Sequence, residues 1–212
     1  MSSNNTVLST KNFVVFEGLD GCGTTTQSSR FASIFSKAKL PYLITAEPTK
    51  MPVGMLIRQV LSGEIHAEPE TLAYLFAADR NEHLYGQNGI LEACTKGQLV
   101  LCDRYVLSSL AYQGSVCKNN LPARLNADFP PPELTVFFRI RPEKAMQRVA
   151  GRSHLEIFEK LAFQERIARM YDDALRQAID AGWRIVEIDA EQNIDSVTDQ
   201  IVKALRGIGL EL

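Results

Sequence analysis

A glycine-rich stretch near the start of the chain has the spacing of a loop that binds phosphate groups. The segment from Gly18 to Thr25 matches the pattern G-x-x-x-x-G-K-[ST] at every position except the lysine. Glycines let backbone amides curl round phosphate oxygens, and a helix starting near Thr24 adds the amides of its N-terminus. The alternative is a tight strand-to-helix turn with no ligand. The residues expected at phosphate are Gly18, Gly21, Cys22, Gly23, Thr24, Thr25 and Thr26.

Position 24 departs from the pattern, because threonine replaces the cation that normally stands beside the β- and γ-phosphates. A pair of unit charges about 4 Å apart is worth about 4 kcal/mol at an effective dielectric constant near 20. Losing most of that from a transition state would slow phosphoryl transfer roughly 100- to 1000-fold, unless another cation replaces the lysine. Nucleotide binding would survive, since the backbone amides and Mg²⁺ act independently of the lysine.

The composition is typical of a single globular domain. The chain has 212 residues, of which 45% are hydrophobic and 23% charged, and its formal net charge is −2. That balance does not favour a nucleic-acid or membrane-surface binder. The four cysteines form no C-x-x-C pair and no histidine lies at metal-ligand spacing, which argues against a zinc site. With no leader-like or membrane-spanning run, we expect a reduced, cytoplasmic protein.

Short apolar runs alternate with segments of helical length. The runs are rich in β-branched and aromatic residues and predict buried strands at Phe13–Phe16, Tyr42–Ala46, Gln98–Cys102, Leu134–Ile140 and Trp183–Ile188. Such a pattern predicts a three-layer α/β fold with a five-stranded parallel sheet flanked by helices. Residues 1–11 are expected to form a disordered tail and residues 12–212 the domain. Ile194–Leu205 is expected to be an amphipathic helix capped by Asn193.

Polar residues follow three of these strands. The glycine-rich loop follows the first, Glu47 the second, and Asp103 and Arg104 the third. Ligands of parallel sheets bind at the carboxyl ends of the strands, so these residues are expected to form one site. Asp103 is placed like a carboxylate that holds Mg²⁺ through water or orients an acceptor, and Thr25 like the hydroxyl ligand of the same ion.

Several separated motifs resemble the thymidylate kinase family of P-loop nucleoside monophosphate kinases. They are Phe16-Glu-Gly-Leu-Asp-Gly-Cys-Gly23, Glu47-Pro-Thr49, Phe76-Ala-Ala-Asp-Arg80 and Asp103-Arg-Tyr-Val-Leu-Ser-Ser-Leu-Ala-Tyr-Gln-Gly114. Their order and spacing cover residues 12–207. The resemblance implies the P-loop NTPase fold, a transfer of phosphate from ATP to dTMP that requires Mg²⁺, and a homodimer.

Phe76 and Arg80 are four residues apart in a helical stretch, Pro69 to Leu84, and therefore project from one face. A flat aromatic ring there can stack on a base, and a guanidinium can donate to an oxygen such as O4 of thymine. Packing in the core is the alternative for Phe76.

By resemblance, Arg104 and Arg58 bind the phosphate of the acceptor, which suits their planar, permanent charge. A solvated helix face is the alternative for Arg58. Asp20 resembles the residue that meets the 3′-hydroxyl and organises the metal site. Tyr105 resembles one that crowds the 2′ position. The other residues expected at the acceptor are Glu47, Ser109 and Gln113.

Residues 141–159 resemble a mobile lid that closes over ATP and brings cations to the phosphates. Arg148 and Arg152 are the candidates, and a solvated basic helix is the alternative for each. Ile157 stands where family lids often carry arginine, and Gly21 where some members carry one in the phosphate loop. Those two arginines and the loop lysine are therefore absent, which leaves Lys50 and Lys144 as further substitutes.

The expected activity is transfer of the γ-phosphoryl group of ATP to dTMP, giving dTDP and ADP. Two alternatives stay open at this point. The first is a catalytically degraded relative that binds deoxypyrimidine nucleotides as a sensor or partner protein. The second is a kinase for another pyrimidine monophosphate.

Overall fold

The computed structural model describes residues 9–149 and 157–212 of the chain. The strands are β1 (Thr10–Gly18), β2 (Tyr42–Ala46), β3 (Leu99–Asp103), β4 (Pro132–Arg139) and β5 (Ile185–Asp189). The helices are α1 (Thr24–Lys37), α2 (Pro52–Leu61), α3 (Pro69–Tyr85), α4 (Ile90–Thr95), α5 (Val106–Tyr112), α6 (Leu121–Asn126), α7 (Pro142–Val149), α8 (Ile157–Asp180) and α9 (Ile194–Arg206).

The strands form one parallel sheet in the order β2-β3-β1-β4-β5. Phe16 of β1 and Ala46 of β2 both pair with Asp103 of β3. The carboxyl ends of these three strands therefore lie side by side at one edge of the sheet. This confirms the predicted fold class and brings the expected site residues to a common edge.

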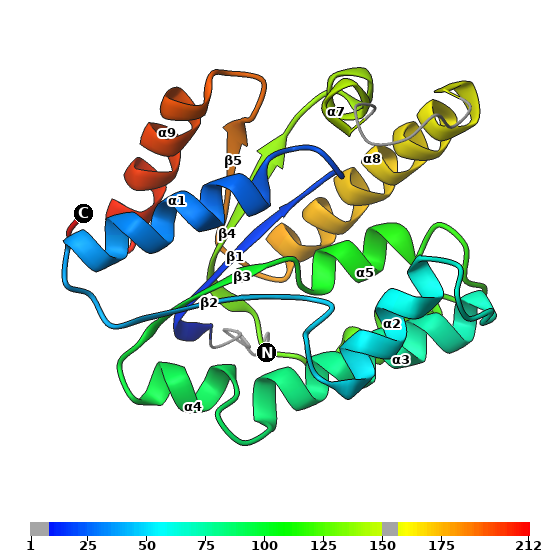
Figure 1. Cartoon of the computed structure of the whole chain (residues 1–212), viewed down its shortest axis with the longest axis horizontal. Helices are drawn as coiled ribbons and strands as arrows, with labels where there is room; N and C mark the ends of the chain where they lie inside the picture. Colours follow the sequence, from blue (N-terminus) through cyan, green and yellow to red (C-terminus); the bar gives the residue numbers. More distant parts are fainter. Residues whose placement is uncertain (1–8, 150–156) are drawn as a thin grey trace, which may run out of the picture.

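Helices cover both faces of the sheet (Figure 1). Helices α1 and α9 lie on one face, where Val14 and Phe16 pack with Phe31. Helices α3, α4, α5 and α8 lie on the other, where Phe13 and Val15 belong to a second apolar cluster. Adjacent residues of β1 point to opposite faces, so the continuous apolar run Phe13–Phe16 supplies both layers of the core.

Element boundaries differ from the predictions by a few residues. Strand β1 begins at Thr10, which pairs with Pro132, so the expected tail of residues 1–11 is too long at its inner end. Residues 1–8 lie outside the described residues. The predicted cap of α9 is confirmed, because the side chain of Asn193 accepts hydrogen bonds from the amides of Asp195 and Ser196.

None of the helices in the described part of the chain is long and apolar enough to cross a membrane. All four cysteines are free thiols.

Candidate active site

The glycine-rich loop joins β1 directly to the first turn of α1. Gly23 has φ +105°, in the left-handed region that favours glycine, and α1 begins at the next residue. The first amides of a helix have no partner within it, so this turn presents donors to an anion. The amide of Cys22 instead donates to the carbonyl of Leu19 at 3.0 Å, and burial raises the pKa of the Cys22 thiol to about 11. The amide of Cys22 therefore stabilises the fold of the loop and is already paired, whereas the sequence predicted that it would bind phosphate.

Thr25, in the first turn of α1, lies next to Asp103 at the end of β3. The hydroxyl of Thr25 donates to Oδ2 of Asp103 at 2.7 Å. Oδ1 of Asp103 is buried and has no hydrogen-bond partner among the described residues. A buried carboxylate oxygen without a donor costs free energy, which a cation or its bound water would recover. The pair is therefore a fitting site for a hard divalent cation.

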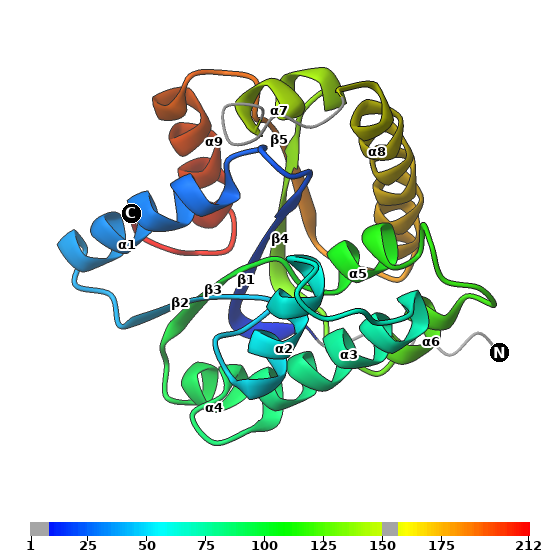
Figure 2. The same cartoon turned by 45° about the vertical axis from the view of Figure 1, so that its right-hand side comes forward.

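Helix α7 packs against the loop (Figure 2). A Cβ added to Gly21 would lie 2.4 Å from the carbonyl oxygen of Ala145. An arginine at position 21 would not fit without displacing α7. Arg148 of the same helix donates to the carbonyls of Cys22 at 3.3 Å and Ala190 at 2.9 Å. Its guanidinium thus reaches the loop as expected, but is bound to carbonyl oxygens.

The middle of the expected lid, with Arg152, lies outside the described residues, and the lid stays a prediction.

Arg104 stands beside the phosphate loop. Its Nη2 atom is 2.6 Å from Oδ1 of Asp20, and its guanidinium lies 5.2 Å from the centre of the Tyr112 ring. The amide of Asp20 donates to the hydroxyl of Tyr112 at 3.1 Å. Arg104 has φ +74°, a strained conformation for a side chain with a Cβ, and such strain is found where function requires it. Arg104 and Asp20 are therefore brought together as predicted.

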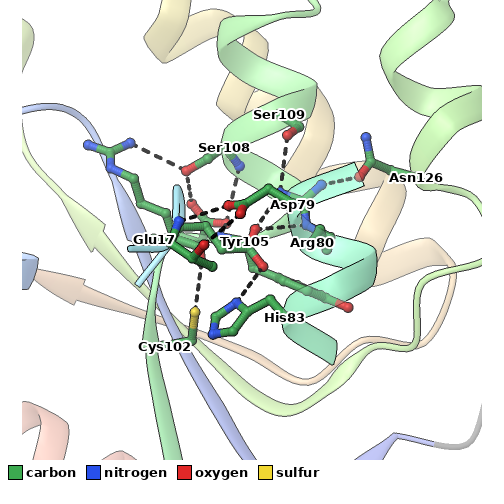
Figure 3. A network of polar contacts seen from close by, with 12 residues as sticks. Glu17, Asp79, Arg80, His83, Cys102, Tyr105, Ser108, Ser109 and Asn126 are labelled. Carbon is green, nitrogen blue, oxygen red and sulfur yellow. Dashed lines mark hydrogen bonds and ion pairs between the residues drawn. The ribbon is translucent and has the colours of Figure 1, made fainter. Parts of the chain in front are cut away.

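A second arginine, Arg80 of α3, is buried in a polar network (Figure 3). Its Nη2 atom lies 2.7 Å from Oε2 of Glu47, and it donates to Ser109 at 3.2 Å and to Asn126. The side chain is 1% exposed, so this ion pair is shielded from water. Phe76, one turn earlier on the same helix, is half-buried. Glu47, Arg80 and Ser109, all expected at the acceptor, thus lie together, with Phe76 one turn away on α3.

His83 extends this network through Glu47, and Figure 3 shows His83 near Cys102. Its Nδ1 atom lies 3.1 Å from Oε1 of Glu47 and its Nε2 atom 2.7 Å from the hydroxyl of Thr45. In the neutral ring, Nδ1 must carry the proton, because a carboxylate can only accept. Glu47, His83 and Cys102 are close enough to hold a metal ion, but burial keeps the pKa of Cys102 well above its ordinary value. The cluster is better described as a hydrogen-bonded support for Glu47.

Arg58 of α2 lies beside the loop that follows β2. Arg58 donates to the carbonyl of Pro48 and, at 3.4 Å, to that of Thr49. Asp79 of α3 fixes the same loop by accepting from the amide of Thr49 at 2.8 Å and from its hydroxyl at 2.6 Å. Arg58 is exposed, and its partners in the described part of the chain are carbonyl oxygens, so its charge stays available to an anion.

One expected acceptor residue, Tyr105, is placed differently from the prediction. Tyr105 is 1% exposed, and its hydroxyl donates to the carbonyl of Pro130 at 3.0 Å. Its ring packs against Arg80 at 5.1 Å, so Tyr105 supports Arg80 and does not stand at the edge of a sugar site. Tyr112, which lies beside Asp20 and Arg104, has the position expected of Tyr105. Gln113 is buried at the end of α5, one turn after Ser109.

Glu17 is a site residue that the sequence analysis did not single out. It is fully buried at the end of β1, where burial raises its pKa while Ser108 and Arg104 oppose that shift. A charged residue directly after four apolar strand residues was the available signal. Asn126 and Asp79 gave no comparable signal.

Comparisons with known proteins show what this chain is similar to. The family model for thymidylate kinase matches residues 16–201. A protein of Treponema pallidum named thymidylate kinase is 39% identical over 198 residues, covering 92% of this chain and 95% of its own. Relatives of the same name from Aeropyrum pernix and Methanocaldococcus jannaschii are each 33% identical. The alignments cover 93% and 92% of this chain, and 97% and 96% of theirs.

Proposed function

The chain belongs to the thymidylate kinase family, and we propose that it transfers the γ-phosphoryl group of ATP to dTMP, giving dTDP and ADP. One observation carries the proposal beyond the comparisons. The phosphate loop, the Thr25–Asp103 pair and Arg104 with Asp20 lie together at the carboxyl edge of the sheet. Donor and acceptor phosphates can therefore be held next to each other, which is what phosphoryl transfer needs.

On the donor side, the amides at the start of α1 would bind the phosphates of ATP. Thr25 and Asp103 would hold Mg²⁺, and the buried, unpartnered Oδ1 of Asp103 supports this assignment. When bound, Mg²⁺ neutralises charge on the phosphoryl oxygens. Thr24 contributes no cation. Arg148 would secure the loop through the carbonyl of Cys22.

On the acceptor side, Arg104 and the exposed Arg58 would bind the 5′-phosphate of dTMP. Phe76 would stack on thymine, and Arg80, held by Glu47 and Ser109, would donate to an oxygen of the base. Gln113 would complete the edge of the base pocket. Asp20 lies between the two halves of the site, where it would orient the sugar and Arg104.

Catalysis in this site consists of positioning and charge stabilisation. Phosphoryl transfer needs little covalent help from the protein, so the chain contributes by aligning the two phosphates and excluding water. Arg104 supplies a permanent positive charge at the acceptor.

A panel of nucleotides tests the acceptor assignment. We expect dTMP and dUMP, which carry the same carbonyl oxygens, to raise the melting temperature more than CMP or GMP at equal concentration. Phe76 and Arg80 form a site for an oxygen-bearing pyrimidine. A ligand at 100 times its dissociation constant adds about 2.7 kcal/mol of apparent stability, which a thermal-shift assay resolves. A larger shift with GMP or CMP than with dTMP would contradict the assignment.

We also propose a homodimer, the state that the family resemblance implies. Large apolar side chains remain about half exposed on α2 and α3, namely Met55, Leu61 and Tyr74, and offer a surface for it.

Four free thiols support a reducing compartment such as the cytoplasm.

A further inference from the structure

Two hydroxyl groups lie between Arg104 and the buried carboxylate of Glu17. Arg104 Nη1 donates to the hydroxyl of Ser108 at 3.3 Å and to that of Tyr171 at 3.5 Å. Ser108 donates to Oε2 of Glu17 at 2.6 Å, and the Tyr171 hydroxyl lies 3.1 Å from the same oxygen. The two hydroxyls are 2.9 Å apart. Both therefore connect the guanidinium to a negative charge that it does not touch.

The anchor of this arrangement is rigid. Oε1 of Glu17 accepts from the amides of Tyr105 at 2.9 Å and Ser108 at 3.1 Å, at the start of α5. Tyr171 comes from the middle of α8, is fully buried, and also lies 3.1 Å from the carbonyl of Gly18 in the phosphate loop. One hydroxyl thus contacts β1, α5 and the phosphate loop.

The two sides of the Arg104 guanidinium differ. Nη1 faces the buried hydroxyls, whereas Nη2 faces Asp20, whose side chain is 53% exposed. An exposed ion pair contributes little and rearranges easily, whereas a buried hydrogen-bonded group is held in place. Nη1 is therefore held in place by buried groups, whereas Nη2 lies on the exposed side of the guanidinium, where an acceptor phosphate would arrive.

We propose that Tyr171, together with Ser108, is a positioning residue that orients Arg104 toward the 5′-phosphate of the acceptor. This rests on the proposed function, in which Arg104 binds that phosphate. Tyr171 does not touch the substrate in this arrangement. Its hydroxyl sets the direction of the guanidinium, and its ring packs against Phe137 at 5.2 Å and Tyr112 at 6.1 Å.

Tyr171→Phe tests the role of the hydroxyl apart from that of the ring, because it removes the hydrogen bonds and keeps the packing. The measurement is the dissociation constant of dTMP and of thymidine, which lacks the phosphate, by titration calorimetry. We expect Tyr171→Phe to weaken dTMP about tenfold and to leave thymidine unchanged, because the loss concerns the phosphate alone. A general loosening of the fold would weaken the binding of both ligands. The decisive readout is therefore the ratio of the dTMP dissociation constant to the thymidine dissociation constant.

Tyr85→Phe is the matched control, since Tyr85 is an exposed tyrosine of α3, and it should leave both constants unchanged. Ser108→Ala tests the same bridge from α5 and should also raise the ratio of the dTMP dissociation constant to that of thymidine, so the proposal stays testable if Tyr171→Phe does not fold. Equal losses of affinity for dTMP and for thymidine, or no change in either affinity, would overturn the proposal.

Arg104→Ala, measured in parallel, separates this inference from the proposed function. A collapse of the dTMP preference in Arg104→Ala but not in Tyr171→Phe or Ser108→Ala would overturn the positioning role alone. A dTMP preference that survives Arg104→Ala would instead show that Arg104 does not bind the phosphate, and the proposed site would fail.

Discussion

Asp103→Asn is expected to lower kcat by at least about 1000-fold while leaving the fold intact. The substitution keeps the shape of the side chain and removes its charge. Together with Thr25, that charge forms the site that fits Mg²⁺. A 1000-fold change corresponds to about 4 kcal/mol of transition-state stabilisation, which is in the range expected for losing a metal ion at a transferring phosphoryl group.

Stability should respond differently from activity. Oδ1 of Asp103 is buried without a partner in the described part of the chain, so a neutral amide should not reduce the free energy of unfolding. Kinetics at saturating ATP and dTMP and unfolding in urea measure the two quantities separately. Asp199→Asn, at an exposed position of α9, is the control and should change neither. Retention of more than a tenth of the activity by Asp103→Asn would rule out this role.

Thr24→Lys is expected to raise kcat roughly 100- to 1000-fold. The new ammonium would stand at the start of α1, where the pattern of the loop places a cation beside the transferring phosphate. An ion pair at about 4 Å is worth about 4 kcal/mol at an effective dielectric constant near 20, and most of it should appear in the rate. Thr24 itself is 6% exposed, so the longer side chain has to extend out of the loop toward the phosphates.

Among the described residues, Arg104 and Arg148 reach the loop, and both already have partners. Arg148 is bound by the carbonyls of Cys22 and Ala190, and Arg104 by Asp20. Thr24→Met, which is long but uncharged, is the matched control and should leave kcat unchanged. Steady-state kinetics of the three proteins decides the question. An equal kcat in an active parent and in Thr24→Lys would show that another cation already replaces the lysine, whereas no activity in either protein would show that more than the lysine has been lost.

Local patterns predicted the fold because each is carried by neighbouring residues. Strand β2 has the bounds predicted from Tyr42–Ala46, and the capped helix after Asn193 follows from a local hydrogen bond. The start of β1 was missed because Thr10 is placed by its pairing with Pro132, more than a hundred residues away.

The candidate site was predicted in part for the same reason. Asp20, Asp103 and Arg104 stand next to strand ends, so their meeting follows from the order of a parallel sheet. The contact between Glu17 and Tyr171 joins residues 154 positions apart, and no spacing rule connects them. Tyr105 was misplaced because its motif fixes its neighbours in sequence, while the direction of its ring is set by packing on Phe13.

Formation of ADP by the unmodified chain, with Mg-ATP and dTMP in a coupled assay, tests the central claim most directly. The account predicts steady ADP formation that requires dTMP and is matched by an equal amount of dTDP. Stabilisation by dTMP without any formation of ADP would contradict the account, and would identify a nucleotide-binding protein built on a kinase fold.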